Sequence, residues 1–108
     1  MAREKFGTLT EQMFYILLCL QTECCGMDIM EQVRAMTGGR VLIGPGTLYH
    51  LLDDFVTAGM IRETKVEGRR RSYLITEAGL AALDAEYCRL LELAEDYRHS
   101  RLGGGARP

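Results

Sequence analysis

The densest charge in the sequence is the run Arg69-Arg70-Arg71, with Lys65 four residues before it. Guanidinium and ammonium groups gathered in this way can lie against phosphates or in the minor groove of a nucleic acid. The whole chain has a formal net charge of −2, so its total charge does not indicate such a partner. Residues 61–76, however, hold five basic and two acidic side chains, a local balance of +3. A basic patch inside an acidic chain predicts a nucleic-acid-binding surface.

A second set of polar side chains precedes the arginines, in the segment 45–58. The apolar residues of this segment recur at helical spacing: Leu48, Leu51, Leu52 and Phe55. His50 lies opposite that apolar face, and Thr47 and Tyr49 flank its boundary. The first turns of a helix can present side chains to base edges in a major groove, and the helix amides there favour a phosphate. The candidate DNA-binding residues are therefore Thr47, Tyr49, His50, Lys65, Arg69, Arg70 and Arg71.

The remaining chemistry-bearing residues form no enzymatic or metal-binding pattern. Cys24 and Cys25 are adjacent, without the Cys-x-x-Cys spacing of a redox or zinc site. The two histidines, His50 and His99, are far apart, and the sequence holds no nucleophile elbow or dinucleotide fingerprint. We therefore expect no catalytic residue, no metal ligand and no cofactor, and we predict that the chain is not an enzyme. A thiol- or metal-responsive role for Cys24 and Cys25 stays open as an alternative.

Cysteine usage and hydropathy indicate the compartment. The sequence has four cysteines and no signal peptide, which favours reduced thiols in the cytosol over a disulfide scaffold. Its longest apolar run, residues 13–20, is shorter than the roughly 20 residues that span a bilayer. We expect a cytoplasmic protein without a membrane partner.

The pattern of elements places the two polar sets in one domain. A first helix is expected to start after Thr8, where Thr8 and Glu11 fit a capping box, and to break at Cys24-Cys25-Gly26. The later elements are expected as helices at 27–36 and 45–58, a short β-prone run at 40–43, strands at 60–66 and 70–75, and a long helix after Thr76. Two short helices followed by a basic hairpin match a helix-turn-helix with a wing. The predicted fold class is mainly α with a minor β part: a winged helix-turn-helix with a two-stranded wing and a long C-terminal dimerisation helix.

The predicted division of the chain follows from these elements. Residues 8–76 are expected to form the DNA-binding domain, 77–102 the dimerisation helix and 103–108 a disordered tail. Apolar residues of the last helix alternate steps of three and four: Leu80, Leu83, Tyr87, Leu90, Ala94 and Tyr97. A helix of about 25 residues spans about 38 Å, more than a body of this size needs, so a partner helix is favoured over intramolecular core. The first helix is apolar on most sides, which either a partner chain or a central place in a monomer would satisfy.

Several short motifs, in register along residues 8–98, resemble one known family. They are Gly44-Pro45-Gly46-Thr47-Leu48-Tyr49, Leu51-Leu52, Ala58-Gly59-Met60-Ile61, and the stretch from Gly68-Arg69-Arg70-Arg71 to Thr76-Glu77-Ala78-Gly79. With them the chain resembles the PadR family of bacterial transcriptional regulators, in its smaller branch with a single C-terminal helix. The resemblance implies a winged-helix homodimer that represses transcription at a palindromic operator. It also implies dimerisation through the last helix, with help from the first.

Two departures from that family bear on the expected site. Asp53-Asp54 stands on the third helix where many relatives have basic residues. An acidic pair near DNA repels phosphate unless it turns away or accepts a hydrogen bond from a cytosine amino group. The sequence contains no tryptophan, so the aromatic drug pocket of the multidrug-sensing relatives is not carried over.

Together these features predict a sequence-specific transcriptional regulator that binds double-stranded DNA as a homodimeric repressor, released by an unknown small-molecule effector. Two third helices related by the dimer axis would read half-sites about 34 Å apart, or a multiple of that distance. A cleft between protomers, near the first and fourth helices, is the expected place for the effector. A winged-helix module that binds proteins instead of DNA is the alternative from another class, which the acidic total would suit.

Overall fold

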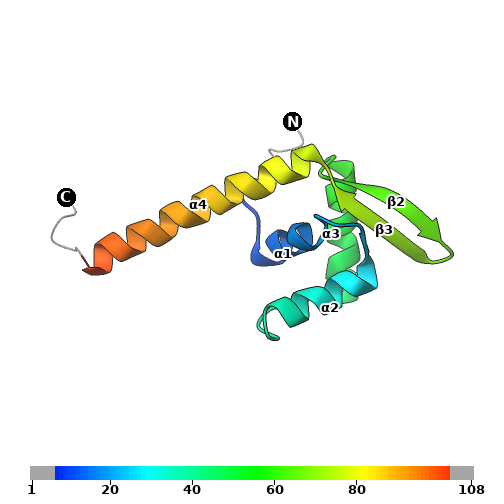
Figure 1. Cartoon of the computed structure of the whole chain (residues 1–108), viewed down its shortest axis with the longest axis horizontal. Coiled ribbons are helices and arrows are strands. Elements are labelled where there is room, and N and C mark those ends of the chain that lie inside the picture. Colours follow the sequence, from blue (N-terminus) through cyan, green and yellow to red (C-terminus); the bar gives the residue numbers. More distant parts are fainter. Residues whose placement is uncertain (1–6, 103–108) are drawn as a thin grey trace.

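The computed structural model describes residues 7–102, in which four helices and three strands follow one another along the chain (Figure 1). In chain order they are α1 (Glu11–Cys19), β1 (Cys24–Cys25), α2 (Gly26–Met36), α3 (Pro45–Thr57), β2 (Ile61–Glu67), β3 (Arg70–Ile75) and α4 (Glu77–Leu102). The tail expected to be disordered, 103–108, lies outside the described residues. Among residues 7–102, none of the helices combines the length and the apolar character that crossing a bilayer requires.

The start of α1 differs from the expected one. Thr10, not Thr8, precedes the helix: its Oγ1 accepts a hydrogen bond from the Met13 N–H (3.2 Å), and Met13 Sδ accepts one from the Thr10 N–H (3.4 Å). The predicted capping box of Thr8 and Glu11 is therefore wrong, because a thioether sulfur takes the part expected of a carboxylate. Glu11 is instead the first helical residue, where its negative charge is favourable near the N-terminus of the helix.

The segment after α1 contains a strand that the sequence did not indicate. The helix ends at Cys19, before the break predicted at Cys24-Cys25-Gly26. The two adjacent cysteines form β1, which pairs antiparallel with β3, Cys24 opposite Tyr73 and Cys25 opposite Ser72. The sheet therefore has three strands in the order β1-β3-β2, of which β2 and β3 form the predicted hairpin. A strand of two residues is too short to show a periodicity, so the sequence indicated only a break.

The β-prone run at 40–43 is not a strand. Val41 and Ile43 are buried and Leu42 between them is exposed, which is the alternation of a half-buried strand. The backbone here is held by a side chain instead: Thr37 Oγ1 accepts a hydrogen bond from the Val41 N–H (3.0 Å) and donates one to the Val33 C=O (2.9 Å). The hydroxyl thus satisfies the Val41 N–H, which a neighbouring strand would otherwise satisfy.

The third helix and the hairpin agree with their predictions. Pro45 occupies the first turn of α3, and Gly59, with a φ of +77°, follows its C-cap. The loop between β2 and β3 is Gly68-Arg69, and the φ of Gly68 is +61°. Glycine with positive φ at the first loop position is typical of a type II′ hairpin turn, which matches the twist of the strands. A β-bulge at Thr64 interrupts the register of β2 against β3.

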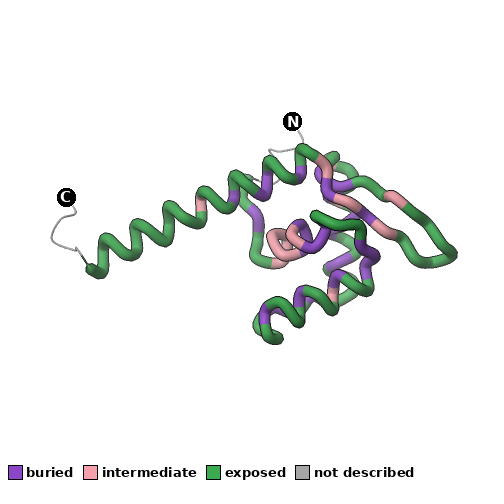
Figure 2. The backbone as a smooth tube through the Cα atoms, in the orientation of Figure 1, coloured by how far each residue is buried: buried purple, intermediate pink, exposed green. Residues whose placement is uncertain are grey.

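The core lies between α1, α2, α3 and the sheet. The largest fully buried side chains are Phe55, Ile16, Leu17, Leu20, Ile29, Leu48, Leu52, Met60, Ile61 and Val33. The first turns of α4 join this core, where Ala82 and Leu83 are buried and Gly79 lies too close to the Met60 backbone for a β-carbon to fit. From residue 90 to 102 every residue of α4 is exposed (Figure 2). The predicted fold class, mainly helical with a hairpin wing and a long C-terminal helix, is confirmed.

Candidate nucleic-acid interface

The helix α3 buries one face and exposes the other. The four residues of its apolar face are at most 8% exposed: Leu48, Leu51, Leu52 and Phe55. Thr47 and His50 are exposed, and Tyr49 is 42% exposed. His50 Nε2 lies 3.5 Å from Asp54 Oδ2 one turn later. The exposed face therefore begins with hydroxyl and imidazole groups and continues to the carboxylates on the next turn.

Arg70 connects the hairpin to the start of α2. Its Nη2 lies 3.6 Å from Asp28 Oδ2 and donates a hydrogen bond to Cys25 Sγ (3.3 Å). Lys65 is held more loosely, with its Nζ 4.0 Å from Glu67 Oε2. All four charged side chains are more than half exposed. Exposed ion pairs contribute only about 0–1 kcal/mol, so a phosphate group can replace these carboxylates as a partner.

Arg71 points to the other side of the hairpin, toward the C-terminal half of α3. Its Nη1 lies 2.9 Å from Glu63 Oε2, and this contact raises the pKa of the guanidinium. With Asp53 and Tyr73 the two side chains line a hollow of about 270 Å³. Burial, and then the charge of Glu63, raise the pKa of the Tyr73 phenol. Asp53 thus lies near a cation, which reduces the repulsion that this carboxylate would exert on a DNA phosphate.

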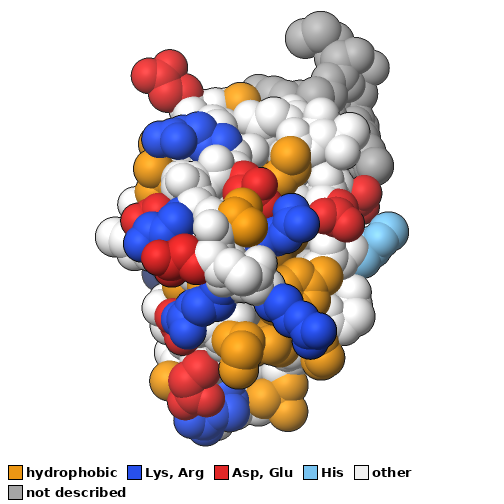
Figure 3. All heavy atoms as spheres, turned by 90° about the vertical axis from the view of Figure 1, so that its right-hand side faces the viewer, with side chains coloured by type: hydrophobic (Ala, Val, Ile, Leu, Met, Phe, Trp, Pro, Cys, Tyr) orange, Lys and Arg blue, Asp and Glu red, His pale blue; other side chains and the backbone are white. Residues whose placement is uncertain are grey.

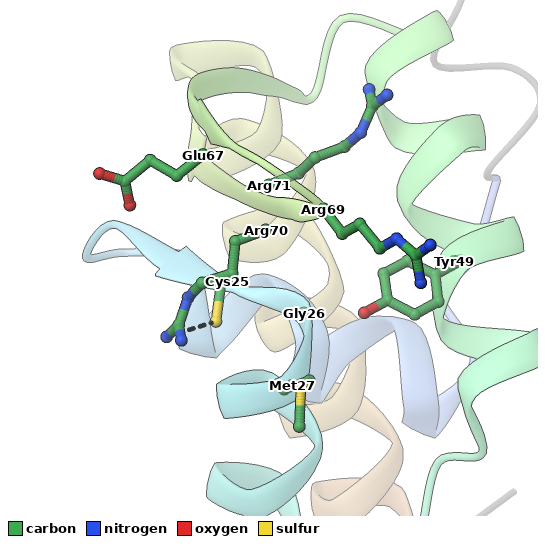
Figure 4. A pocket seen from close by; sticks show the side chains of 8 residues that line it. All are labelled: Cys25, Gly26, Met27, Tyr49, Glu67, Arg69, Arg70 and Arg71. Atoms are coloured by element: carbon green, nitrogen blue, oxygen red, sulfur yellow. Dashed lines mark hydrogen bonds between the residues drawn. The ribbon is translucent and has the colours of Figure 1, made fainter.

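One pocket joins α3 to the arginines of the hairpin (Figure 4). Tyr49 from α3, Gly26 and Met27 from the start of α2, and residues 69–71 from the hairpin line a cavity of about 240 Å³. Arg69 extends toward the side of the pocket where Tyr49 lies, and Arg70 toward Cys25. Seen from the end of the hairpin, Lys and Arg side chains gather on this face, with Asp and Glu among them (Figure 3). Arg71 also lines the pocket, but its guanidinium points away from it toward Glu63. A concave surface with the guanidinium groups of Arg69 and Arg70 and a phenol hydroxyl suits an anionic ligand.

The predicted site residues are therefore only partly brought together. Tyr49 and the three arginines share the pocket, whereas Thr47, His50 and Lys65 do not line it. Sequence reasoning missed the lining residues Cys25, Gly26, Met27 and Glu67, as well as Asp28 beside Arg70. The pairing of β1 with β3, which places Cys25 opposite Ser72, is the feature that brings them here.

The cysteines at this face are thiols in unequal surroundings. Cys24 and Cys25 are both buried and free. Burial, reinforced by the nearby Asp28 charge, raises the pKa of Cys24 to about 11, which disfavours the reactive thiolate. The Cys25 thiol donates to Asp28 Oδ2 (3.3 Å) and accepts from Arg70. Within residues 7–102, no three His, Cys, Asp or Glu side chains are placed to hold a metal ion.

A second hollow lies between α1 and α4. It measures about 300 Å³ and its lining includes Phe14, Tyr15 and Leu90. At its wall Glu86, only 4% exposed, accepts a hydrogen bond from the Leu9 N–H (3.1 Å) and pairs with Arg89. The Arg89 guanidinium, and then the Leu9 N–H, lower the pKa of Glu86 against the effect of burial. The carboxylate therefore ties the segment before α1 to α4 in its ionised form.

Known proteins with the same fold are transcriptional regulators. The chain matches the model of the transcriptional regulator PadR-like family over residues 16–85. A complex structure of RosR, a protein of H. salinarum, is 26% identical with a TM-score of 0.69, over 85% of this chain and 79% of that one. A transcriptional regulator from Clostridium thermocellum is 25% identical, with a TM-score of 0.68 over 82% and 87% of the two chains. A PadR-like transcription factor from Bacteroides fragilis is 25% identical, with a TM-score of 0.68 over 80% and 85%. No curated protein sequence matches the chain.

The family match covers more than half of the chain, from within α1 to the first turns of α4. It includes the third helix, the hairpin and the pocket between them. Proteins of this family regulate transcription by binding DNA and are not enzymes, in agreement with both predictions from the sequence. The chain belongs to the PadR-like family and is a DNA-binding transcriptional regulator.

Proposed function

We propose that the protein is a homodimeric repressor that reads a palindromic operator in double-stranded DNA. In this proposal α3 enters a major groove and the hairpin lies along phosphates or in the adjoining minor groove. The proposed contact residues are Thr47, Tyr49, His50, Lys65, Arg69, Arg70 and Arg71. The observation that carries the proposal is the pocket that Tyr49 of α3 and residues 69–71 of the hairpin line together.

The two elements have different tasks in this arrangement. The exposed side chains of α3 offer hydroxyl and imidazole groups to base edges, which carry the sequence information. The arginines offer charge to phosphates, which contributes affinity for any sequence and makes it depend on salt. Asp28 pairs with Arg70 at the pocket, and Glu63 pairs with Arg71 beside it. When DNA binds, its phosphates would replace these two carboxylates as partners of the arginines.

The proposed dimer is supported by the exposed part of α4. A helix of 26 residues is about 39 Å long, and here it extends away from the body (Figure 1). Leu90 and Leu91 on this part are 39% and 50% exposed, and Tyr97 is 67% exposed. A second copy of α4 would remove these apolar side chains from water. We propose accordingly that residues 8–76 form the DNA-binding domain and 77–102 the dimerisation helix.

Release by a small molecule is the last part of the proposal. An effector shifts DNA binding only by its difference in affinity for the DNA-competent and DNA-incompetent shapes of the dimer. The hollow between α1 and α4 supports such a role, because it lies where the DNA-binding body meets the proposed dimerisation helix. A molecule bound there would change the angle between the two DNA-reading units.

The experiment is selection of binding sites from random duplex DNA, followed by affinity measurements at several salt concentrations. Arg70→Ala is expected to weaken binding to all sequences and to reduce the salt slope by about 1, whereas Thr47→Ala changes the preferred half-site. The matched control is Arg98→Ala, which removes an exposed arginine paired with Glu95 on α4 and should leave the slope unchanged. If no sequence is enriched, the result contradicts sequence-specific DNA binding and supports the alternative of a protein-binding module. If the salt slope of Arg70→Ala is unchanged, the result contradicts the contact between the hairpin and a phosphate.

A further inference from the structure

Gly26, the first residue of α2, lies directly beside the ring of Tyr49. A methyl group built on Gly26 would be 2.7 Å from the Tyr49 hydroxyl oxygen, 2.8 Å from Cε1 and 2.9 Å from Cζ. These distances are well below van der Waals contact, so the ring occupies the space that any other residue would fill. Gly26 is not among the glycines with a positive φ, so its backbone does not itself require glycine.

The side chain in this contact is partly open to solvent. Tyr49 is 42% exposed, and it shares the pocket with Gly26 and the three arginines (Figure 4). Gly26 itself is buried and follows β1, which pairs with β3. Because that backbone is tied into the sheet, the tip of the tyrosine is the more mobile side of the contact.

We propose that Gly26 is a positioning residue for DNA recognition, acting through Tyr49. The absence of a β-carbon lets the ring rest across the start of α2, with its hydroxyl beside Gly26. A ring held in place before binding loses less rotamer freedom when it meets DNA. The inference rests on the proposed function, since it takes Tyr49 to be a DNA contact.

Alanine at position 26 is expected to displace the ring while the fold is kept. Because Gly26 does not have a positive φ, alanine can adopt its backbone conformation at the start of α2 without strain. The atoms in the way belong to the far end of a half-exposed side chain that can rotate into solvent. Gly26→Ala should therefore unfold at a temperature close to that of the wild type but bind DNA less well.

The test is a double-mutant cycle with Gly26→Ala and Tyr49→Ala on the selected operator. We expect each single variant to bind about five- to tenfold more weakly, which corresponds to roughly 1–1.4 kcal/mol. The double variant should bind no more weakly than Tyr49→Ala alone, because Gly26 has no ring left to position. Gly7→Ala is the matched control: its methyl enters open space in the segment before α1, outside α3 and the hairpin, and its affinity should stay within about twofold.

The other possible results of this cycle separate a failure of the positioning role of Gly26 from a failure of the Tyr49 contact. If Gly26→Ala weakens binding equally with and without the Tyr49 ring, or has no effect while Tyr49→Ala does, the positioning role is overturned. If Tyr49→Ala binds normally while Arg70→Ala is impaired, the Tyr49 contact fails and this inference with it, although DNA binding through the hairpin stands. If Gly26→Ala does not fold, NMR of the wild type decides. Nuclear Overhauser contacts between the Gly26 α-protons and the Tyr49 ring are expected, and their absence overturns the proposal.

Discussion

The helices α3 and α4 both carry apolar side chains at helical spacing, but the chain buries one set and exposes most of the other. On α3 the apolar face, ending with Phe55 at 0% exposure, lies against α1, α2 and the sheet. On α4 Leu83 is 5% exposed, whereas Tyr97 fourteen residues later is 67% exposed. The sequence pattern is alike, and the difference lies in whether the same chain supplies the covering surface.

The apolar faces of α3 and α4 therefore have different roles, although their sequence patterns are similar. The apolar face of α3 stabilises the body and thereby holds the polar face toward DNA. The apolar residues of α4 beyond Glu86 add little to the single chain and are available to a second copy. Changes on α3 should therefore affect folding, and changes on the outer part of α4 should affect assembly.

The largest effect is expected from Phe55→Ala on α3. Removing a fully buried aromatic ring leaves a cavity and costs about 3–5 kcal/mol of the free energy of unfolding. Urea denaturation followed by circular dichroism measures this loss. Val56→Ala, on the next residue and 42% exposed, is the control and should change the free energy by well under half as much. Equal losses would mean that α3 is not packed as described.

The next effect sharpens the contrast on α4. Leu90→Glu places a charge in the proposed dimer seam, so we expect a folded chain that sediments as a monomer and binds the operator at least tenfold more weakly. Sedimentation velocity and circular dichroism separate assembly from folding. Glu92→Lys lies on the opposite face of the helix and should still dimerise. A Leu90→Glu variant that remains dimeric would place the interface elsewhere.

A smaller effect is expected where the two parts of α4 meet. The pKa of Glu86 is lowered in the folded state, below the value of about 4.3 in unfolded chains. Its contribution is therefore present above that value and is lost as the pH falls through the folded pKa. Glu86→Gln should lower the free energy of unfolding by about 1–2 kcal/mol at pH 7, and the difference from the wild type should shrink below pH 4. Glu95→Gln, which breaks an exposed pair with Arg98, is the control with little change at either pH. A difference for Glu86→Gln that grows in acid would contradict the assigned sign.

The smallest effect concerns DNA affinity alone. Asp28→Asn removes the carboxylate that lies 3.6 Å from Arg70. Arg70 can then bind a DNA phosphate without first breaking its ion pair with Asp28. We expect binding to become up to about fivefold tighter, with folding and dimerisation unchanged, as suits an exposed pair. Titration of a labelled operator measures it, and Asp84→Asn on α4 is the control for the loss of one negative charge. Weaker binding by Asp28→Asn would show that Asp28 positions Arg70 for DNA instead of competing with it.

The sequence was sufficient for elements whose evidence is local. Four apolar residues at helical spacing located α3, and Glu67-Gly68 between β-prone runs located the hairpin. The sequence was not sufficient where the structure of a segment depends on contacts with residues far away in the sequence. Cys24 and Cys25 became a strand only because β3 lies beside them, and Glu86, which resembles any surface carboxylate, is buried because Leu9 and Arg89 bind it.

The candidate site shows the same limit. The arginine run and the polar face of α3 were visible in the sequence, each within one element. Their meeting in one pocket depends on the start of α2, which the sequence did not connect with either. Gly26 in particular looks like an ordinary helix boundary until the ring of Tyr49 is seen against it.

The most direct test of the central claim is a hydroxyl-radical footprint of the wild-type protein on its selected operator, combined with the mass of the complex. Two copies of the chain, held together by α4, should protect two symmetric stretches of backbone whose centres lie about 34 Å apart, or a multiple of that distance. A single protected stretch with one chain bound would contradict the account.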